Sequence, residues 1–280
     1  AMLQKLGKKT AFIGKVGNDF LGKHLKKVVE EVGIDTRNLL LDEKVHTTLA
    51  FVHTYPDGDR DFSFYRDPGA DMNLRPEEVD EALIADSRIF HFGSLSMTHP
   101  GVREATQKAL RIAKESGCLI SFDPNLRPPL WNTLEEARER IAFGMTQCDI
   151  LKISDNEIQW FTGEEDYDAG IRILQQTYRI PLILLSMGRD GSRAYYRDSR
   201  VEAAPFLQKN TIETTGAGDT FCACVLSFVL EHGLDDLSEQ DLHEMLRFAN
   251  AAAALITTRK GALRVMPTKE EVQALLAASL

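Results

Sequence analysis

The sequence predicts an α/β protein with a doubly wound, mostly parallel β-sheet and helices on both of its faces. Strand-like and helix-like segments alternate along most of the chain, which is typical of parallel sheets. Runs such as "LILL" at 182–185 are apolar at every position, as expected of strands covered on both faces. We expect residues 1–280 to form a single domain, because a chain of this length can bury one large core.

The first part of the chain departs from this alternation. Residues 10–16 ("TAFIGKV") predict a short strand, which leads into a helix that stops at Gly33. Two β-rich runs within 47–66 flank "PDGD", a hairpin signal, and no helix separates them. We therefore expect a hairpin that stands off the main sheet, with residues 45–72 forming a small β lid inserted in the domain.

After the lid, each strand-like segment is followed by a helix or a polar loop. Ligands of open α/β sheets bind beyond the carboxyl ends of the strands, so these loops predict the site. The four strand-like segments are "SRIFHFGS" (87–94), "GCLISFD" (117–123), "CDILKIS" (148–154) and "IPLILLSMG" (180–188).

Composition excludes several classes of partner. A formal net charge of −9 argues against nucleic-acid binding, which needs a basic surface. No apolar run approaches the ~18 residues of a membrane span, so we expect no membrane partner. The four cysteines lack the spacing of a zinc site or a disulfide framework, which favours core thiols and a cytoplasmic location.

The segment "TTGAGDTF" (214–221) carries the clearest chemistry. Gly216, Ala217 and Gly218 leave backbone N–H groups open to an anion, and a helix starting near Asp219 adds its positive end. A capping aspartate would need no such glycine run. Phosphoryl transfer needs both parts, because N–H donors bind the migrating group while a carboxylate accepts the proton of the attacking hydroxyl.

At these residues the chain resembles the ribokinase-like, or PfkB, family of sugar kinases. The resemblance runs from "AFIGKVGNDFLG" to "TRKGALRVMP", essentially the whole chain. It implies a ribokinase-like fold, ATP and Mg²⁺ as cofactors, Asp219 as the catalytic base, and Gly216, Ala217 and Gly218 as the anion hole.

The resemblance also implies a nucleotide site. The residues that it nominates are Ser186, Gly188 and Gly191 in "SMGRDGS", Thr215 before the anion hole, and Asn250 and Gly261 beside the adenine.

"KISDNE" occupies the place of the family's Asn-x-x-Glu motif. Glu157 matches the glutamate, which organises Mg²⁺ and phosphate through water. Ser154 replaces the asparagine, so the polar partner of the phosphates is in doubt here. Lys152 adds a positive charge nearby.

Many members of the family bind potassium beside the anion hole, mostly through backbone oxygens. The matching residues are Glu213, Thr215, Ile256, Arg259, Gly261 and Val265. The first position is usually aspartate. The longer Glu213 side chain either reaches the cation, fills its site or points elsewhere.

The substrate is indicated by "RDFSFYRDPGADM", which resembles the fructokinase pattern and favours D-fructose, phosphorylated to fructose 6-phosphate. "SFDPNLRPPLW" fits fructokinases and also 2-keto-3-deoxygluconate kinases. Arg66, Asn125 and Arg127 would bind the sugar beside Asp219. The keto-acid remains an alternative, since Arg66 or Arg127 could pair with its carboxylate. An inactive nucleotide- or sugar-binding regulator is the alternative of another class.

Two further expectations come from the resemblance. Members of the family begin with a strand carrying a sugar-binding aspartate and then a Gly-Gly-x-x-x-Asn segment. Neither is found here, so we expect a strand to precede Ala1. Lids of this kind often pair between subunits, which predicts a homodimer formed through the lid.

Overall fold

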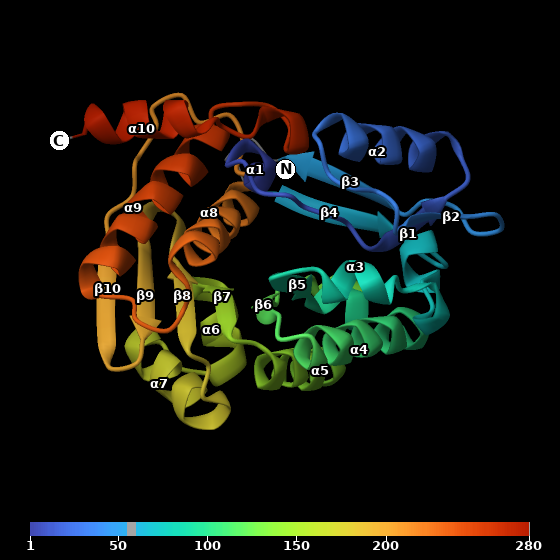
Figure 1. Ribbon diagram of the computed structural model, residues 1–280, viewed down its shortest axis with the longest axis horizontal. Helices are drawn as coiled ribbons and strands as arrows, with labels where there is room; N and C mark the ends of the chain where they lie inside the picture. Colours follow the sequence, from blue (N-terminus) through green and yellow to red (C-terminus); the bar gives the residue numbers. More distant parts are fainter. Residues whose placement is uncertain (55–59, 280) are drawn as a thin grey trace.

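A six-stranded sheet forms the centre of the protein, with the mostly parallel order that the sequence predicts (Figure 1). The structure is a computed structural model that describes residues 1–54 and 60–279. The strands run in the order β10-β9-β8-β7-β6-β5. Strands β5 to β8 are parallel to one another, and β9 is antiparallel to both of its neighbours, β8 and β10. Their bounds are β5 (Ile89–Gly93), β6 (Leu119–Asp123), β7 (Ile150–Ser154), β8 (Leu182–Ser186), β9 (Ser192–Tyr196) and β10 (Ser199–Ala203).

Helices cover both faces of this sheet, as expected for a doubly wound fold (Figure 1). On one face are α3 (Glu81–Ala85), α4 (Pro100–Glu115), α5 (Leu134–Gln147), α6 (Asp155–Thr162) and α7 (Tyr167–Tyr178). On the other are α1 (Met2–Lys5), α8 (Ala217–His232), α9 (Glu239–Ile256) and α10 (Lys269–Ala277).

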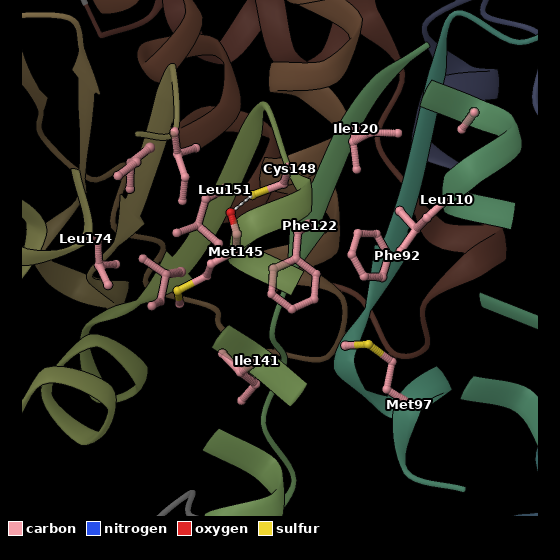
Figure 2. Close-up of a cluster of buried hydrophobic side chains, with 14 of the residues drawn as sticks. Phe92, Met97, Leu110, Ile120, Phe122, Ile141, Met145, Cys148, Leu151 and Leu174 are labelled. Atoms are coloured by element: carbon pink, nitrogen blue, oxygen red, sulfur yellow. Dashed lines mark hydrogen bonds between the residues drawn. The ribbon is translucent and has the colours of Figure 1, made fainter. Parts of the chain in front are cut away.

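The strands alternate between two buried cores. In β7, Leu151 and Ile153 belong to the core under α4 to α7, whereas Ile150 belongs to the core under α8 and α9. Figure 2 shows the first core, where the Phe92 and Phe122 rings stack with centroids 4.6 Å apart. Burial on both faces explains why these strands are apolar at successive positions.

The N-terminal part forms a second, two-stranded sheet. Strand β1 (Gly14–Gly17) pairs in parallel with β2 (Leu39–Asp42), and α2 (Phe20–Glu31) connects them. The predicted strand at 10–16 begins too early, because Ala11 makes only an isolated bridge to Asp35.

The lid strands β3 (Leu49–Thr54) and β4 (Arg60–Tyr65) pair with each other and with neither of the other sheets (Figure 1). This confirms the hairpin strands that the sequence predicts. The predicted turn, "PDGD", lies at 56–59, outside the described residues.

No helix within the described ranges combines the length and the apolar character that crossing a bilayer requires.

Candidate active site

Asp123, Lys152 and the glycine run at 216–218 lie close together. They come from the carboxyl end of β6, from β7 and from the start of α8. Asp123 is the last residue of β6, and Lys152 lies in β7. The Nζ atom of Lys152 is 3.1 Å from Asp123 Oδ2, and both side chains are buried. A Cβ atom at Gly218 would lie 3.4 Å from the same Nζ atom. The ammonium group therefore sits beside the glycine run that begins α8.

Helix α8 begins two residues earlier than the sequence predicts. Its N-cap is Gly216, which adopts a left-handed conformation with φ of 77°, and Asp219 is the third helical residue. No side chain in the described part of the chain caps this N-terminus. The amides of Gly218 and Asp219 belong to the first turn and have no intrahelical acceptor, so they face an anion at the positive end of the helix.

One of the predicted anion-hole donors is partly used by the fold itself. The Ala217 amide donates to the Thr214 carbonyl at 3.2 Å, which closes the turn before the helix. The Thr220 amide starts the helical ladder by donating to the Gly216 carbonyl at 2.8 Å. The anion hole at Gly216, Ala217 and Gly218 stays a prediction, to which the structure adds the Asp219 amide as a further donor without a partner inside the helix.

The Asp219 carboxylate is exposed at this point. Among residues 1–54 and 60–279, no hydrogen bond or ion pair engages its side chain. A substrate hydroxyl can therefore reach it. The structure also removes the alternative of a simple helix cap, because the capping position belongs to Gly216.

Burial and mutual attraction shift the pKa values of the Asp123–Lys152 pair. Burial of the Asp123 carboxyl raises its pKa to about 6; the charge on Lys152 opposes the rise, and those on Glu157 and Asp219 add to it. Burial acts to lower the pKa of Lys152, but the charges on Asp123 and Glu157 outweigh it and leave the pKa raised. Lys152 therefore keeps its positive charge at neutral pH.

Glu157 joins the loops that follow β6 and β7. Its Oε2 atom accepts hydrogen bonds from the Ser154 amide at 2.9 Å and the Ser154 hydroxyl at 2.8 Å. Its Oε1 atom accepts from the Leu126 amide at 2.8 Å. Ser154 is the N-cap of α6 and forms a capping box with Glu157.

The predicted magnesium role of Glu157 fits this arrangement through water. Each carboxylate oxygen has lone pairs beyond those used, and Mg²⁺ usually keeps several waters and takes the rest of its ligands from phosphates. In the ranges that the structure describes, no group of three His, Cys, Asp or Glu side chains could hold a metal ion.

The loop after β8 has glycine at two positions where the backbone is left-handed. Ser186 ends β8, and Gly188 and Gly191 have φ of 54° and 91°. A Cβ atom at Gly191 would lie 2.3 Å from the Ala203 carbonyl oxygen. Only glycine therefore fits at that position.

Asn250, predicted to lie beside the adenine, is hydrogen-bonded within the fold. Its Nδ2 group donates to the Ala203 and Ala204 carbonyls, each at 3.1 Å, and its Oδ1 atom accepts from the Ser192 hydroxyl at 2.8 Å. The buried side chain thus joins α9 to β9 and the end of β10. These hydrogen bonds support the neighbouring loop, and the contact with adenine stays a prediction.

The predicted sugar ligands fall in two places. Asn125 and Arg127 follow β6; the Asn125 backbone has φ of 45°, and its amide donates to Asp123 Oδ1 at 3.1 Å. Arg66 follows the lid strand β4 and pairs with Asp71, with Nε and Oδ2 2.8 Å apart. It also donates to the Thr98 hydroxyl at 2.8 Å, which connects the lid to the loop after β5.

The residues predicted for a potassium site are carried by two loops that contact each other. Thr215 lies in the first loop, in which Glu213 Oε1 accepts from the Gly261 amide at 2.6 Å. In the second loop, the Arg259 guanidinium donates to the Val265 carbonyl at 3.0 Å, and the Arg259 amide donates to the Ile256 carbonyl at 3.0 Å.

Sequence reasoning underrated one residue of this site, Asp123. The segment "DPN" at the carboxyl end of a strand is the signal that could have found it. Its buried ion pair with Lys152 could not be predicted from local sequence, because the two residues lie 29 positions apart.

Comparison with known proteins gives consistent matches. The sequence profile described as "pfkB family carbohydrate kinase" matches residues 1–269. An Arabidopsis thaliana protein named "Probable fructokinase-4" is 38% identical over 274 residues, which cover 98% of this chain and 84% of that protein.

Two solved structures are similar over nearly the whole chain. A Xylella fastidiosa fructokinase with bound ATP has a TM-score of 0.88 at 31% identity, covering 99% of this chain and 88% of the other. A Vibrio cholerae O395 fructokinase with fructose, ADP and calcium bound has a TM-score of 0.87 at 26% identity, covering 98% and 88%.

Proposed function

Because this chain belongs to the pfkB family of carbohydrate kinases, we propose that it transfers the γ-phosphoryl group of ATP to D-fructose and forms fructose 6-phosphate. One observation carries the chemistry: a buried ammonium, an uncapped helix N-terminus and an unengaged carboxylate converge at Gly218 and Asp219. The names of the similar proteins support fructose as the acceptor.

The geometry supports in-line transfer with Asp219 as the base. The sugar hydroxyl gives its proton to the Asp219 carboxylate as its oxygen bonds to the γ-phosphorus, and the bond from phosphorus to the ADP oxygen breaks. The amides of Gly218 and Asp219 donate to the transferring phosphoryl oxygens, while Lys152 balances their charge.

Magnesium supplies charge neutralisation at the phosphate oxygens when it is bound with ATP. Glu157 would hold it through water, from a carboxylate that Ser154 and the Leu126 amide keep in place. Asn125 and Arg127 would orient the sugar next to Asp123.

The keto-acid alternative is weaker in this structure. A carboxylate substrate needs a guanidinium group with donors to spare. Arg66, one of the two candidates, is buried and donates to Asp71, the Thr98 hydroxyl and the Leu95 carbonyl. Arg127 is then the candidate left for such a carboxylate, and fructose remains the acceptor that we propose, on the names of the similar proteins.

We further propose that two copies of the chain pair through their lids. Phe51, Val52 and Tyr65 expose 58%, 51% and 68% of their surface, although each is a large hydrophobic residue. The rings of Phe51 and Tyr65 meet edge to face at 5.4 Å. Exposed aromatic side chains in contact with each other, as Phe51 and Tyr65 are, are typical of an interface.

A reducing, cytoplasmic compartment is also part of the proposal. All four cysteines are free and buried. Expression with a fluorescent tag in the native host, followed by fractionation, would locate the protein.

The proposed function is tested by measuring ADP release with ATP and Mg²⁺ over D-fructose, 2-keto-3-deoxygluconate, ribose, glucose and adenosine. We expect turnover on fructose. Asp219→Asn should lower kcat by about 10²–10⁴-fold with fructose binding retained, because general-base catalysis contributes that much. Asp198→Asn, on an exposed turn, is the matched control. Near-normal turnover by Asp219→Asn would show that another group takes the proton.

A further inference from the structure

A hollow of about 530 Å³ lies among α1, α8, α9 and α10, four helices that gather on one face of the main sheet (Figure 1). Sites for small molecules have volumes of about 300–1,000 Å³, so this one is large enough for a ligand. Ser227, which lines it, lies about 12 Å along α8 from Asp219, at 1.5 Å per residue. The hollow is therefore separate from the candidate active site.

The inner wall of the hollow is apolar. Cys224 and Met245 line it and are 3% and 1% exposed. The Phe228 ring stacks on the His232 imidazole, with ring centroids 4.0 Å apart. The remaining apolar lining comes from Leu6, Phe248, Leu276 and Ala277. This wall would take the apolar part of a ligand, because burial removes apolar surface from water.

One hydroxyl group belongs to the same wall. The Ser227 side chain lines the hollow and is 6% exposed. Across residues 1–54 and 60–279, no hydrogen bond engages this hydroxyl. Buried hydroxyl groups normally have a hydrogen-bond partner, because leaving one without a partner costs free energy. Ser227 therefore marks a point where a ligand atom would complete the hydrogen bonding.

Two positive side chains of the hollow have no acidic partner. Arg247 is partly buried, and its guanidinium lies over the Phe206 ring, 5.6 Å from the centroid. Within the part of the chain that the structure describes, it makes no hydrogen bond or ion pair. Lys269 is exposed at the start of α10 and likewise has no ion pair among the described residues. Both charges are thus available to an anion.

The two carboxylates that line the hollow, by contrast, have partners. Glu231 Oε1 pairs with Lys8 Nζ at 2.5 Å. Glu244 is exposed, and its Oε1 atom accepts from the Gln240 side-chain amide at 3.0 Å. The unmatched charges of the hollow are therefore those of Arg247 and Lys269, which favours a negative group on the ligand. A guanidinium matches a carboxylate best, because both are planar and can form two parallel hydrogen bonds.

We propose that this hollow binds a small amphipathic carboxylate. The apolar body of the ligand packs against Phe228 and Met245, and its carboxylate pairs with Arg247. The Ser227 hydroxyl supplies a further hydrogen bond. This site goes beyond the proposed kinase activity and does not depend on it.

The test uses octanoate, octanol and octylammonium as probes, which share a chain and differ in charge. Isothermal titration calorimetry measures the Kd of each, with and without saturating ATP and Mg²⁺. The variants are Arg247→Gln, which removes the charge, Arg247→Lys, which keeps it, and Ser227→Ala. Arg111→Gln, at an exposed arginine of α4 on the other face of the sheet, is the matched control. Melting temperatures show whether each variant is folded.

We expect octanoate to bind one site per chain, at least tenfold more tightly than octanol or octylammonium, whether or not ATP is present. Arg247→Gln should weaken octanoate about tenfold and leave octanol unchanged, and Arg247→Lys should restore most of the loss. Ser227→Ala should weaken octanoate about fivefold.

Three results would overturn the proposal. The first is an octanoate Kd that Arg247→Gln leaves at the level of Arg111→Gln. The second is displacement of octanoate by ATP, which would place the probe in the nucleotide site. The third is binding of octylammonium as tight as that of octanoate, or no binding of octanoate at all. None of these results depends on whether a sugar is phosphorylated.

Discussion

Lys152 shows how a buried charge can serve a catalytic site. Burial of an ammonium group costs free energy unless an opposite charge lies close to it. Asp123 Oδ2 lies 3.1 Å from Nζ, and a Cβ atom at Gly218 would lie 3.4 Å from the same Nζ atom. We therefore regard Asp123 as a positioning residue that holds Lys152 where a phosphoryl oxygen would meet it.

Replacing Asp123 by asparagine tests this role. The variant removes the nearest counter-charge of the buried Lys152 and leaves only that of Glu157, so we expect kcat to fall by about tenfold or more. The folded-state pKa of Asp123 is raised to about 6, so the carboxylate is ionised above that pH and protonated below it. Wild-type kcat/KM should fall as the pH drops through 6, and the variant should lack this step.

The pH profile separates positioning from simple structural damage. A variant that had only lost stability would keep the step near pH 6 at reduced amplitude. Asp198→Asn, on an exposed turn, serves as the control for added amide groups. A step that is equal in the wild type and in Asp123→Asn would assign the titration to another group.

At the scale of elements, Asp19 connects a helix cap to the base of the lid. Its Oδ1 atom accepts from the Gly22 amide at 2.8 Å and caps α2, while its Oδ2 atom accepts from the Thr47 amide at 2.8 Å. The hydrogen bonds from the Thr47 and Gly22 amides lower the pKa of Asp19 to about 2. One carboxylate thus stabilises both elements.

Asp19→Asn should lower the free energy of unfolding at pH 7 by about 1 kcal/mol, because the amide has one acceptor oxygen for the two backbone N–H groups that the carboxylate accepts. The folded-state pKa lies below the ordinary value of 3.8, so the stabilisation is complete above pH 4 and is lost as the pH falls through 2. The difference from the wild type should therefore shrink over that window. Urea unfolding from pH 2 to 7 measures it.

Asp236→Asn provides the comparison for this prediction, because its side chain is 94% exposed. We expect no change at any pH in that variant. A constant difference between wild type and Asp19→Asn down to pH 2 would mean that the carboxylate charge contributes nothing to the cap.

At the scale of the whole molecule, the lid carries apolar surface that the rest of the chain does not cover. Replacing Phe51 and Tyr65 by serine should convert a dimer into a monomer, because about 25 cal/mol is lost for each Å² of apolar surface no longer buried. Sedimentation velocity measures the change. Leu207→Ser, at another exposed apolar residue, is the control. A wild type that sediments as a monomer at high concentration would contradict lid pairing.

Much of the fold could be predicted because its signals are local. Alternating strand-like and helix-like segments, apolar strands and the hairpin pattern each arise within a short window, and all three correspond to observed elements. Boundaries were less accurate. Strand β1 starts at Gly14, and α8 starts at the left-handed Gly216, since a cap depends on backbone geometry that residue types only suggest.

The sequence by itself determined the layered α/β fold, the glycine-rich helix start and the presence of Asp219 there, because each depends on residues that are close along the chain. Only the tertiary structure decided what the polar side chains contact. It paired Asp123 with Lys152, directed Asn250 to Ala203 and Ser192, and joined Glu213 to Gly261. The physical reason is that a polar group buried by folding takes whichever partner packing brings within hydrogen-bond distance, and these partners lie 29 to 58 residues away.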